Sequence, residues 1–120
     1  MARLLVHITV GPHDPTKVAL GLLVARTALD GGHEVDVFFA GDAVAVLRPS
    51  TLAAGHGVGT GSLEEHVNAL VGGGARIHAS RMSSNARGLG AGDVGDVPVG
   101  FATPDMLVRL TFEADRVLCY

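Results

Sequence analysis

The chain has 120 residues, of which 48% are hydrophobic and 18% are charged, and its formal net charge is −3. This size and composition predict one packed domain over residues 1–120 and argue against a disordered chain. The net negative charge and the few aromatic residues argue against nucleic-acid binding. Charged residues interrupt every long apolar run, which argues against a membrane-spanning segment.

The first elements follow from a short apolar run and a strong helix signal. Residues 4–10 are almost continuously apolar, which predicts a strand buried on both faces of a parallel sheet. Residues 11–13 turn the chain, and Asp14 then predicts the N-cap of a helix over residues 15–30. The proline at its first position and the two glycines after its last residue support these limits.

The helix over residues 15–30 lacks a wide polar face. At 100° per residue Lys17 and Arg26 point in opposite directions, whereas a helix at the surface of a domain usually keeps one side for water. Aliphatic residues cover most of its circumference: Val18, Leu20, Leu22, Leu23, Val24 and Leu29. We expect a second buried face against another subunit, and the alternative is packing by neighbouring elements of the same chain.

The middle of the chain alternates a strand with less regular segments. Residues 34–40 predict a second strand, and a short helix is expected over residues 43–47. Residues 48–61 are rich in Gly, Ser and Thr and predict a flexible loop. Within that loop, residues 55–61 lack the Gly-Lys-Ser/Thr ending of a phosphate loop and follow a helix, so they do not indicate a nucleotide site.

The next two elements have clear boundary signals. Ser62 and Glu65 predict a capping box for a helix that ends at the three glycines of residues 72–74. Residues 76–79 then predict the third strand.

The last third of the chain completes the alternation. Residues 90–100 predict a loop that contains a short strand at residues 97–100. Thr103-Pro104-Asp105 precedes a helix over residues 106–114, and residues 116–120 predict the closing strand. The order of elements predicts an α/β fold with a mostly parallel, about five-stranded sheet and helices on both faces.

The most polar stretch, residues 80–87, directly follows the third strand. In a parallel sheet the loops at residues 11–14 and 41–42 leave strands at the same edge, where ligands usually bind. From composition we expect a solvated loop whose serines cap the next helix, and the alternative is that the arginines and hydroxyls there hold a small anion. The candidate site residues are His13, Asp14, Arg81, Ser83, Ser84, Asn85 and Arg87.

The six histidines do not have metal-site spacing, because none is four residues from another. We therefore expect no metal and no other cofactor. His7 and His78 lie inside predicted strands and are expected to be hydrogen-bonded core or edge residues.

Enzymatic chemistry has weaker support than binding. Ser83 and Ser84 have no G-x-S-x-G elbow and no assignable base, although His13 could approach the same edge. Cys119, the only cysteine, lies in an apolar strand and is expected to be buried and inert. A single cysteine cannot form an internal disulfide, which is compatible with a reducing cytoplasm.

Four segments, spread over essentially the whole chain, resemble the DsrE/DsrF-like (TusD/YchN-like) sulfur-relay family: Gly11 to Thr16, Gly32 to Asp42, Ala86 to Leu89 and Glu113 to Leu118. This resemblance implies a small α/β sandwich with a mostly parallel sheet. It also implies a homo-oligomer, either a trimer or a hexamer.

The family's carrier residue has a different identity in this chain. In sulfur-transferring members a cysteine lies four residues before the Arg of an Ala-Arg-Gly segment and carries a persulfide between partner proteins. Counting back from Arg87 gives Ser83, whose hydroxyl cannot hold transferable sulfur. We therefore predict a cytoplasmic ligand-binding or scaffold subunit that is more a binding protein than an enzyme. The alternatives are a sulfur-relay subunit acting with a cysteine-bearing partner and an enzyme for a small anionic substrate.

Overall fold

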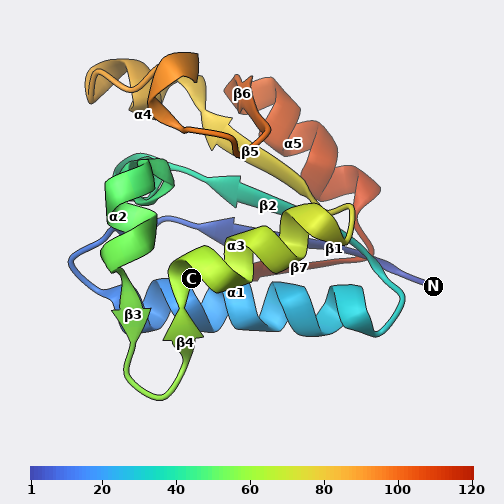
Figure 1. Ribbon diagram of the computed structural model, residues 1–120. Coiled ribbons are helices and arrows are strands. Elements are labelled where there is room, and N and C mark those ends of the chain that lie inside the picture. Colours follow the sequence, from blue (N-terminus) through green and yellow to red (C-terminus); the bar gives the residue numbers. More distant parts are fainter.

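A sheet of five parallel strands forms the centre of the protein in the computed structural model, which describes residues 1–120 (Figure 1). The strand order is β6-β5-β2-β1-β7, so the first strand of the chain lies inside the sheet and the last lies at its edge. The strands are β1 (Arg3–Ile8), β2 (Glu34–Phe39), β5 (Arg76–Ser80), β6 (Val99–Ala102) and β7 (Arg116–Cys119). The predicted α/β fold with a five-stranded sheet is confirmed.

Helices cover both faces of this sheet, but unequally. Helices α1 (Pro15–Asp30) and α3 (Leu63–Gly72) lie side by side on one face, and α5 (Pro104–Glu113) crosses the other alone (Figure 1). The remaining helical segments are η1 (Gly41–Leu47), α2 (Pro49–Ala54), α4 (Arg81–Ala86) and η2 (Ala91–Asp93).

The strand pattern explains why the two faces differ. Parallel register partners point to the same face, and Val6, Val37 and Ile77 are such partners on the side of α1 and α3. They belong to a core of 21 buried hydrophobic residues. The face toward α5 buries a cluster of only four: Leu5, Phe38, Ala102 and Leu110. Most of the hydrophobic stabilisation therefore comes from the α1 and α3 side.

Helix α1 has the predicted limits and cap. The Asp14 carboxylate accepts a hydrogen bond from the Lys17 amide at 3.2 Å, and one side of the helix is buried in the core. Leu20 and Leu23 remain 41% and 37% exposed, so elements of the same chain do not cover the whole circumference. Coverage of these two residues by another subunit stays a prediction. No helix of the protein has the length and hydropathy needed to cross a membrane.

The prediction of a flexible loop over residues 48–61 was wrong. Helix α2 begins at Pro49, and a hairpin of β3 (His56–Gly57) and β4 (Gly61–Ser62) follows it. The glycines that suggested flexibility meet backbone requirements instead, because Gly59 has φ +72° in the hairpin turn. The Val58 amide donates to Thr16 Oγ1 at 2.9 Å, which attaches the hairpin to α1.

The short strand predicted at residues 97–100 begins two residues before the strand that the structure contains. The structure forms β6 at Val99–Ala102, because Pro98 has no N–H to donate to a neighbouring strand. Helix α5 likewise starts at Pro104 rather than at residue 106. Ser62 caps α3 as predicted, accepting the Glu65 amide at 3.2 Å.

Candidate functional site

The carboxyl edge of the sheet brings the three predicted loops together. The loop after β1 contacts the loop after β2 so closely that a Cβ on Gly11 would lie 2.7 Å from Asp42 Cβ. The loop after β2 in turn contacts α4, which follows β5 directly. This convergence follows from the parallel sheet, in which all five strands end at one edge.

Ser83 lies at the contact between two of these loops. Its Oγ accepts a hydrogen bond from the Gly41 N–H at 2.9 Å, and its own amide donates to Ser80 Oγ at 3.1 Å. Ser80 therefore caps α4. The expectation of a solvated loop was wrong here, because residues 81–86 are helical and Ser83 and Ser84 lie inside the helix. Gly41 has φ +58°, a conformation that few other residues adopt. This conformation directs the Gly41 N–H toward the Ser83 hydroxyl. The Ser83 hydroxyl thus joins the loops after β2 and β5.

Arg87 ties the end of α4 to the same loop. One guanidinium nitrogen binds Asp42 Oδ1 at 2.8 Å, and the other donates to the Ser83 carbonyl at 3.1 Å. The hydrogen bond and the charge of Arg87 lower the pKa of the Asp42 carboxyl, and His13 contributes a weaker charge effect in the same direction. Asp42 is therefore ionised over the neutral range, and His13 lies near it at the carboxyl edge of the sheet.

Arg48 also contacts these residues, although the sequence did not indicate it as a site residue. Its guanidinium donates to the Arg87 carbonyl at 3.3 Å and lies 3.9 Å from Asp93 Oδ1. Arg48 precedes the first proline of α2, and no local pattern relates it to residues 81–87. Three-dimensional contact alone identifies it.

The other predicted residues are divided among different roles. Arg81 donates to the Phe101 carbonyl of β6 at 3.2 Å, so Arg81 and Arg87 have separate partners. Ser84 is fully buried and its Oγ has no hydrogen-bond partner, so that hydroxyl does not face the surface. Asn85 and His13 are exposed, whereas Asp14 caps α1. The structure brings Ser83, Arg87 and His13 to one place but does not join the two arginines.

Three hollows of the protein lie away from residues 81–87. The largest, of about 420 Å³, lies between α2, α3 and residues 94–97. The others, of about 310 and 410 Å³, lie at the opposite end of the sheet and beside the start of α1. None of the three is lined by residues 81–87. The structure also contains no group of three or more His, Cys, Asp or Glu side chains that could hold a metal ion.

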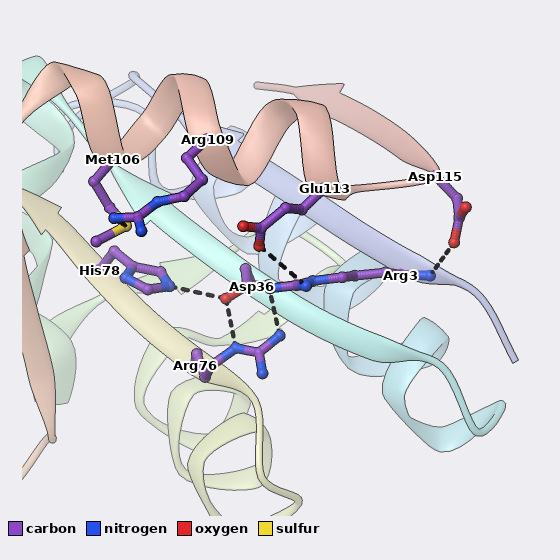
Figure 2. Close-up of polar contacts among 8 residues, drawn as sticks. All are labelled: Arg3, Asp36, Arg76, His78, Met106, Arg109, Glu113 and Asp115. Atoms are coloured by element: carbon purple, nitrogen blue, oxygen red, sulfur yellow. Dashed lines mark hydrogen bonds and ion pairs between the residues drawn. The ribbon is translucent and has the colours of Figure 1, made fainter.

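A second polar group lies under α5, around the buried carboxylate of Asp36 (Figure 2). Arg76 binds both carboxylate oxygens, at 2.7 and 2.9 Å, and His78 Nε2 lies 2.9 Å from Oδ1. Arg3 approaches the same carboxylate at 3.5 Å and also binds Glu113 of α5 at 3.2 Å. The group therefore joins β1, β2, β5 and α5.

The ionisation of Asp36 follows from these contacts. Burial alone would raise its pKa, but the hydrogen bonds and charges of Arg76 and His78 outweigh burial and hold that pKa well below its ordinary value. Sequence reasoning missed this group, although a carboxylate inside an otherwise apolar strand was a usable signal.

The predictions for His7, His78 and Cys119 had different outcomes. His78 is hydrogen-bonded to Asp36, as predicted for a satisfied strand residue. The same expectation was wrong for His7, because its buried Nε2 has no partner and burial lowers its pKa. Cys119 was expected to be buried, yet it is exposed because β7 is an edge strand.

Comparisons with known proteins identify a family from the sequence and a fold from the structure. Residues 2–120 match the model of the DsrE/DsrF-like family. No curated protein matches the sequence significantly. Among solved structures, the YchN protein of E. coli is 18% identical with a TM-score of 0.85, and each chain is covered completely.

Two further structures are similar over nearly their whole length. MTH1491 of Methanobacterium thermoautotrophicum, a protein of unknown function, is 20% identical with a TM-score of 0.78 and 100% coverage of both chains. BT1422 of Bacteroides thetaiotaomicron, also of unknown function, is 13% identical with a TM-score of 0.69, covering 99% of this chain and 95% of that one. At these identities the similarity establishes the fold.

Proposed function

Because the chain belongs to the DsrE/DsrF-like family, we propose that it is a cytoplasmic, homo-oligomeric ligand-binding or scaffold subunit without persulfide chemistry at Ser83. The observation that carries the proposal is the hydroxyl at the position where the resemblance places the family's carrier thiol. The surrounding geometry is that of an ordered loop, since Gly41 donates to this hydroxyl and Arg87 binds the same turn of α4.

The chemistry of the substitution supports this proposal. A thiol with a pKa near 8.5 is partly ionised at neutral pH and attacks sulfur donors as the thiolate. An alcohol hydroxyl does not ionise in this range and forms no stable bond to sulfane sulfur. The Gly41 N–H that could stabilise a thiolate at this position serves here as an ordinary hydrogen-bond donor. The loop keeps an ordered framework, but the reacting atom differs.

The shape of the surface favours a protein partner over a small ligand. Residues 81–87 line none of the three hollows of about 310 to 420 Å³, whereas drug-sized ligands usually occupy enclosed clefts. Met82, beside Ser83, is 66% exposed, and Arg81 and Asn85 are exposed with it. An exposed methionine among polar groups suits a contact between proteins.

Two alternatives differ in their support. A sulfur-relay subunit that acts with a cysteine-bearing partner would use the same exposed surface of α4, so it is the second candidate. An enzyme acting on a small anion is less well supported, because Arg81 and Arg87 bind different protein groups. The hydrogen-bond partner of the Ser83 hydroxyl is a backbone amide and not an imidazole.

A sulfur-loading experiment tests the proposal directly. The wild-type protein is mixed with polysulfide, and added sulfur is located by intact and peptide mass spectrometry. We expect no sulfur on residue 83 and none transferred to a thiol acceptor. An adduct on Cys119 that passes to an acceptor would overturn the proposal, since Cys119 is exposed.

A matched pair of variants tests whether the loop keeps carrier geometry. In a Cys119→Ser background, Ser83→Cys is expected to gain a sulfur adduct, because the Gly41 amide faces that position. Ser84→Cys is the control, since residue 84 is fully buried, and it should gain none. If Ser83→Cys stays unmodified while a small alkylating reagent reaches it, the assignment of Ser83 to the carrier position is wrong.

The predicted homo-oligomer, a trimer or a hexamer, is part of this proposal. Its support is the exposure of Leu20 and Leu23 on α1 and of Val117 and Leu118 on the edge strand β7, at 37 to 41% each. Burying such residues in a contact between subunits would be favourable. Native mass spectrometry of the purified protein measures the subunit number, and a monomer at all concentrations would contradict this part.

A further inference from the structure

The largest of the three hollows, of about 420 Å³, lies between α2, α3 and residues 94–97. Its volume is within the range of about 300–1,000 Å³ that is usual for small-molecule sites. No residue of the 81–87 segment lines it, so it is separate from the surface around Ser83. Three segments of the chain form it, and only the tertiary fold brings them together.

The deepest part of this hollow is apolar. Leu52 of α2 and Val94 are each 4% exposed, and both belong to the main hydrophobic core. Val71 of α3 and Val97 pack against that core and also line the hollow. An aliphatic group placed here would leave water for a surface formed by core residues, which is favourable.

A close contact sets the wall formed by residues 94–97 against α2. Gly95 has φ +60°, and a Cβ at this position would lie 3.0 Å from Pro49 Cγ. Glycine combines this backbone conformation with the lack of a side chain that the contact requires. The two walls are therefore packed on each other at one end, and the hollow is already present in the free protein.

Two carboxylates lie at the rim of the hollow, on different walls. Glu64 lies on α3 with Asn68 one turn later, and Asp96 lies on the segment after η2. Both carboxylates are exposed, and neither takes part in an ion pair of the protein. The dipole of α3 favours an acidic residue in its first turn, which accounts for Glu64. It does not account for Asp96 on the other wall.

The protein supplies no cation to this hollow. No arginine, lysine or histidine is among the residues that line it. Arg48, which directly precedes α2, donates to the Arg87 carbonyl at 3.3 Å and lies 3.9 Å from Asp93 Oδ1. The rim therefore carries negative charge that no basic side chain neutralises, and the ligand that complements it is a cation.

We propose that this hollow binds a small alkylammonium compound, that is, a primary amine on a short aliphatic chain. The aliphatic chain contacts Leu52, Val71 and Val94, and the ammonium group lies at the rim with Glu64 and Asp96. An ammonium group has three donors and no acceptor, which suits a rim of carboxylates. An anion of the same size would meet two like charges instead.

This inference goes beyond the proposed function, which concerns residue 83 and the surface of α4. It assigns a ligand class to a part of the protein that the proposed function does not use. The sulfur-loading experiment does not involve the hollow, so either proposal can fail while the other stands.

Backbone amide NMR spectra locate the binding and measure its dissociation constant. The probes are n-pentylamine, n-pentanol and pentanoate, which share an aliphatic chain and differ in charge. The amine should shift the amides of Val71, Gly72 and Gly95 in a saturable manner. We expect it to bind about fivefold more tightly than the alcohol, and pentanoate should not bind measurably. Added salt should weaken the binding of the amine alone.

Variants of the rim residues test the charge recognition. Glu64→Gln and Asp96→Asn should each raise the dissociation constant of n-pentylamine about threefold, because each removes one of two charges. Glu65→Gln is the matched control, since Glu65 is exposed on the same turn of α3 and does not line the hollow. Asn68→Lys should abolish binding, because it places an alkylammonium group of the protein itself at the rim. Circular dichroism checks that each variant remains folded.

Four results would overturn the proposal. They are an amine that shifts none of the amides lining the hollow, equal affinities for the amine and the alcohol, equal effects of Glu64→Gln and Glu65→Gln, and unchanged binding to folded Asn68→Lys. Amine-induced shifts spread evenly over all exposed carboxylates would show general charge attraction and would also refute a site at this hollow.

Discussion

The Asp36 carboxylate allows the sharpest test of how the fold is held together. It is 2% exposed and accepts hydrogen bonds from Arg76 at 2.7 and 2.9 Å. Removing one partner of a buried ion pair usually costs about 3–5 kcal/mol, because the other charge remains uncompensated. Arg76 is 48% exposed and can be hydrated after the loss, so we expect Asp36→Asn to lower the free energy of unfolding by about 2–3 kcal/mol.

Urea unfolding followed by far-ultraviolet circular dichroism measures this loss, since the chain has no tryptophan and one tyrosine. Asp96→Asn is the matched control, because Asp96 is exposed and takes part in no ion pair or side-chain hydrogen bond of the structure. A surface change of this kind alters stability by less than about 0.5 kcal/mol.

The pH dependence separates the charge effect from a packing effect. The pKa of Asp36 is lower in the folded than in the unfolded protein, so its stabilisation is fully present above the unfolded value of about 3.9 and is lost as the pH falls below it. The difference between wild type and Asp36→Asn should be constant from about pH 5 to 7 and shrink on acidification. An unfolding free energy within 0.5 kcal/mol of wild type at pH 7, or a difference that does not change on acidification, would refute this account.

Three further predictions concern the carboxyl edge of the sheet. Ser84→Ala should raise the free energy of unfolding by about 1 kcal/mol, because its buried hydroxyl has no partner, whereas Ser83→Ala should lower it by about 1 kcal/mol. A lower free energy of unfolding for Ser84→Ala in the same urea titration would show that the Ser84 hydroxyl is hydrogen-bonded. Gly11→Ala should destabilise by about 1–3 kcal/mol, since its Cβ would lie 2.7 Å from Asp42 Cβ, and an unchanged denaturation midpoint would contradict that contact. Arg87→Gln should raise the pKa of Asp42 toward its ordinary value, measured by carboxyl NMR titration, and an unchanged pKa would exclude the ion pair as the cause.

The order of elements was predictable because local signals agreed with it. The apolar strand at residues 4–10 and the caps at Asp14 and Ser62 predicted elements that the structure contains. The error at residues 48–61 arose because glycine permits both flexibility and the positive φ angles of a tight hairpin. Composition does not distinguish these two uses.

Strand order was the information that the sequence did not contain. Cys119 was expected in the core because its strand is apolar, but β7 lies at the sheet edge and exposes it. Asp36 and Arg76 are 40 residues apart and become register partners only after β2 and β5 pair. At the candidate site, the meeting of the loops was predictable from a parallel sheet. The partners of Arg87 and Arg81 were not, because they depend on side-chain directions.

The position of Asp36 also affects which wrong structures the chain avoids. Side chains alternate along a strand, so a slip of β2 by one residue would turn Asp36 toward α1 and α3, among the 21 buried hydrophobic residues and away from its cationic partners. An unpaired carboxylate there would be far less stable than the paired one. The network therefore favours the observed register, because a misaligned sheet would bury the Asp36 carboxylate without its cationic partners. An all-apolar replacement of the group could fold as stably and still populate more than one strand alignment.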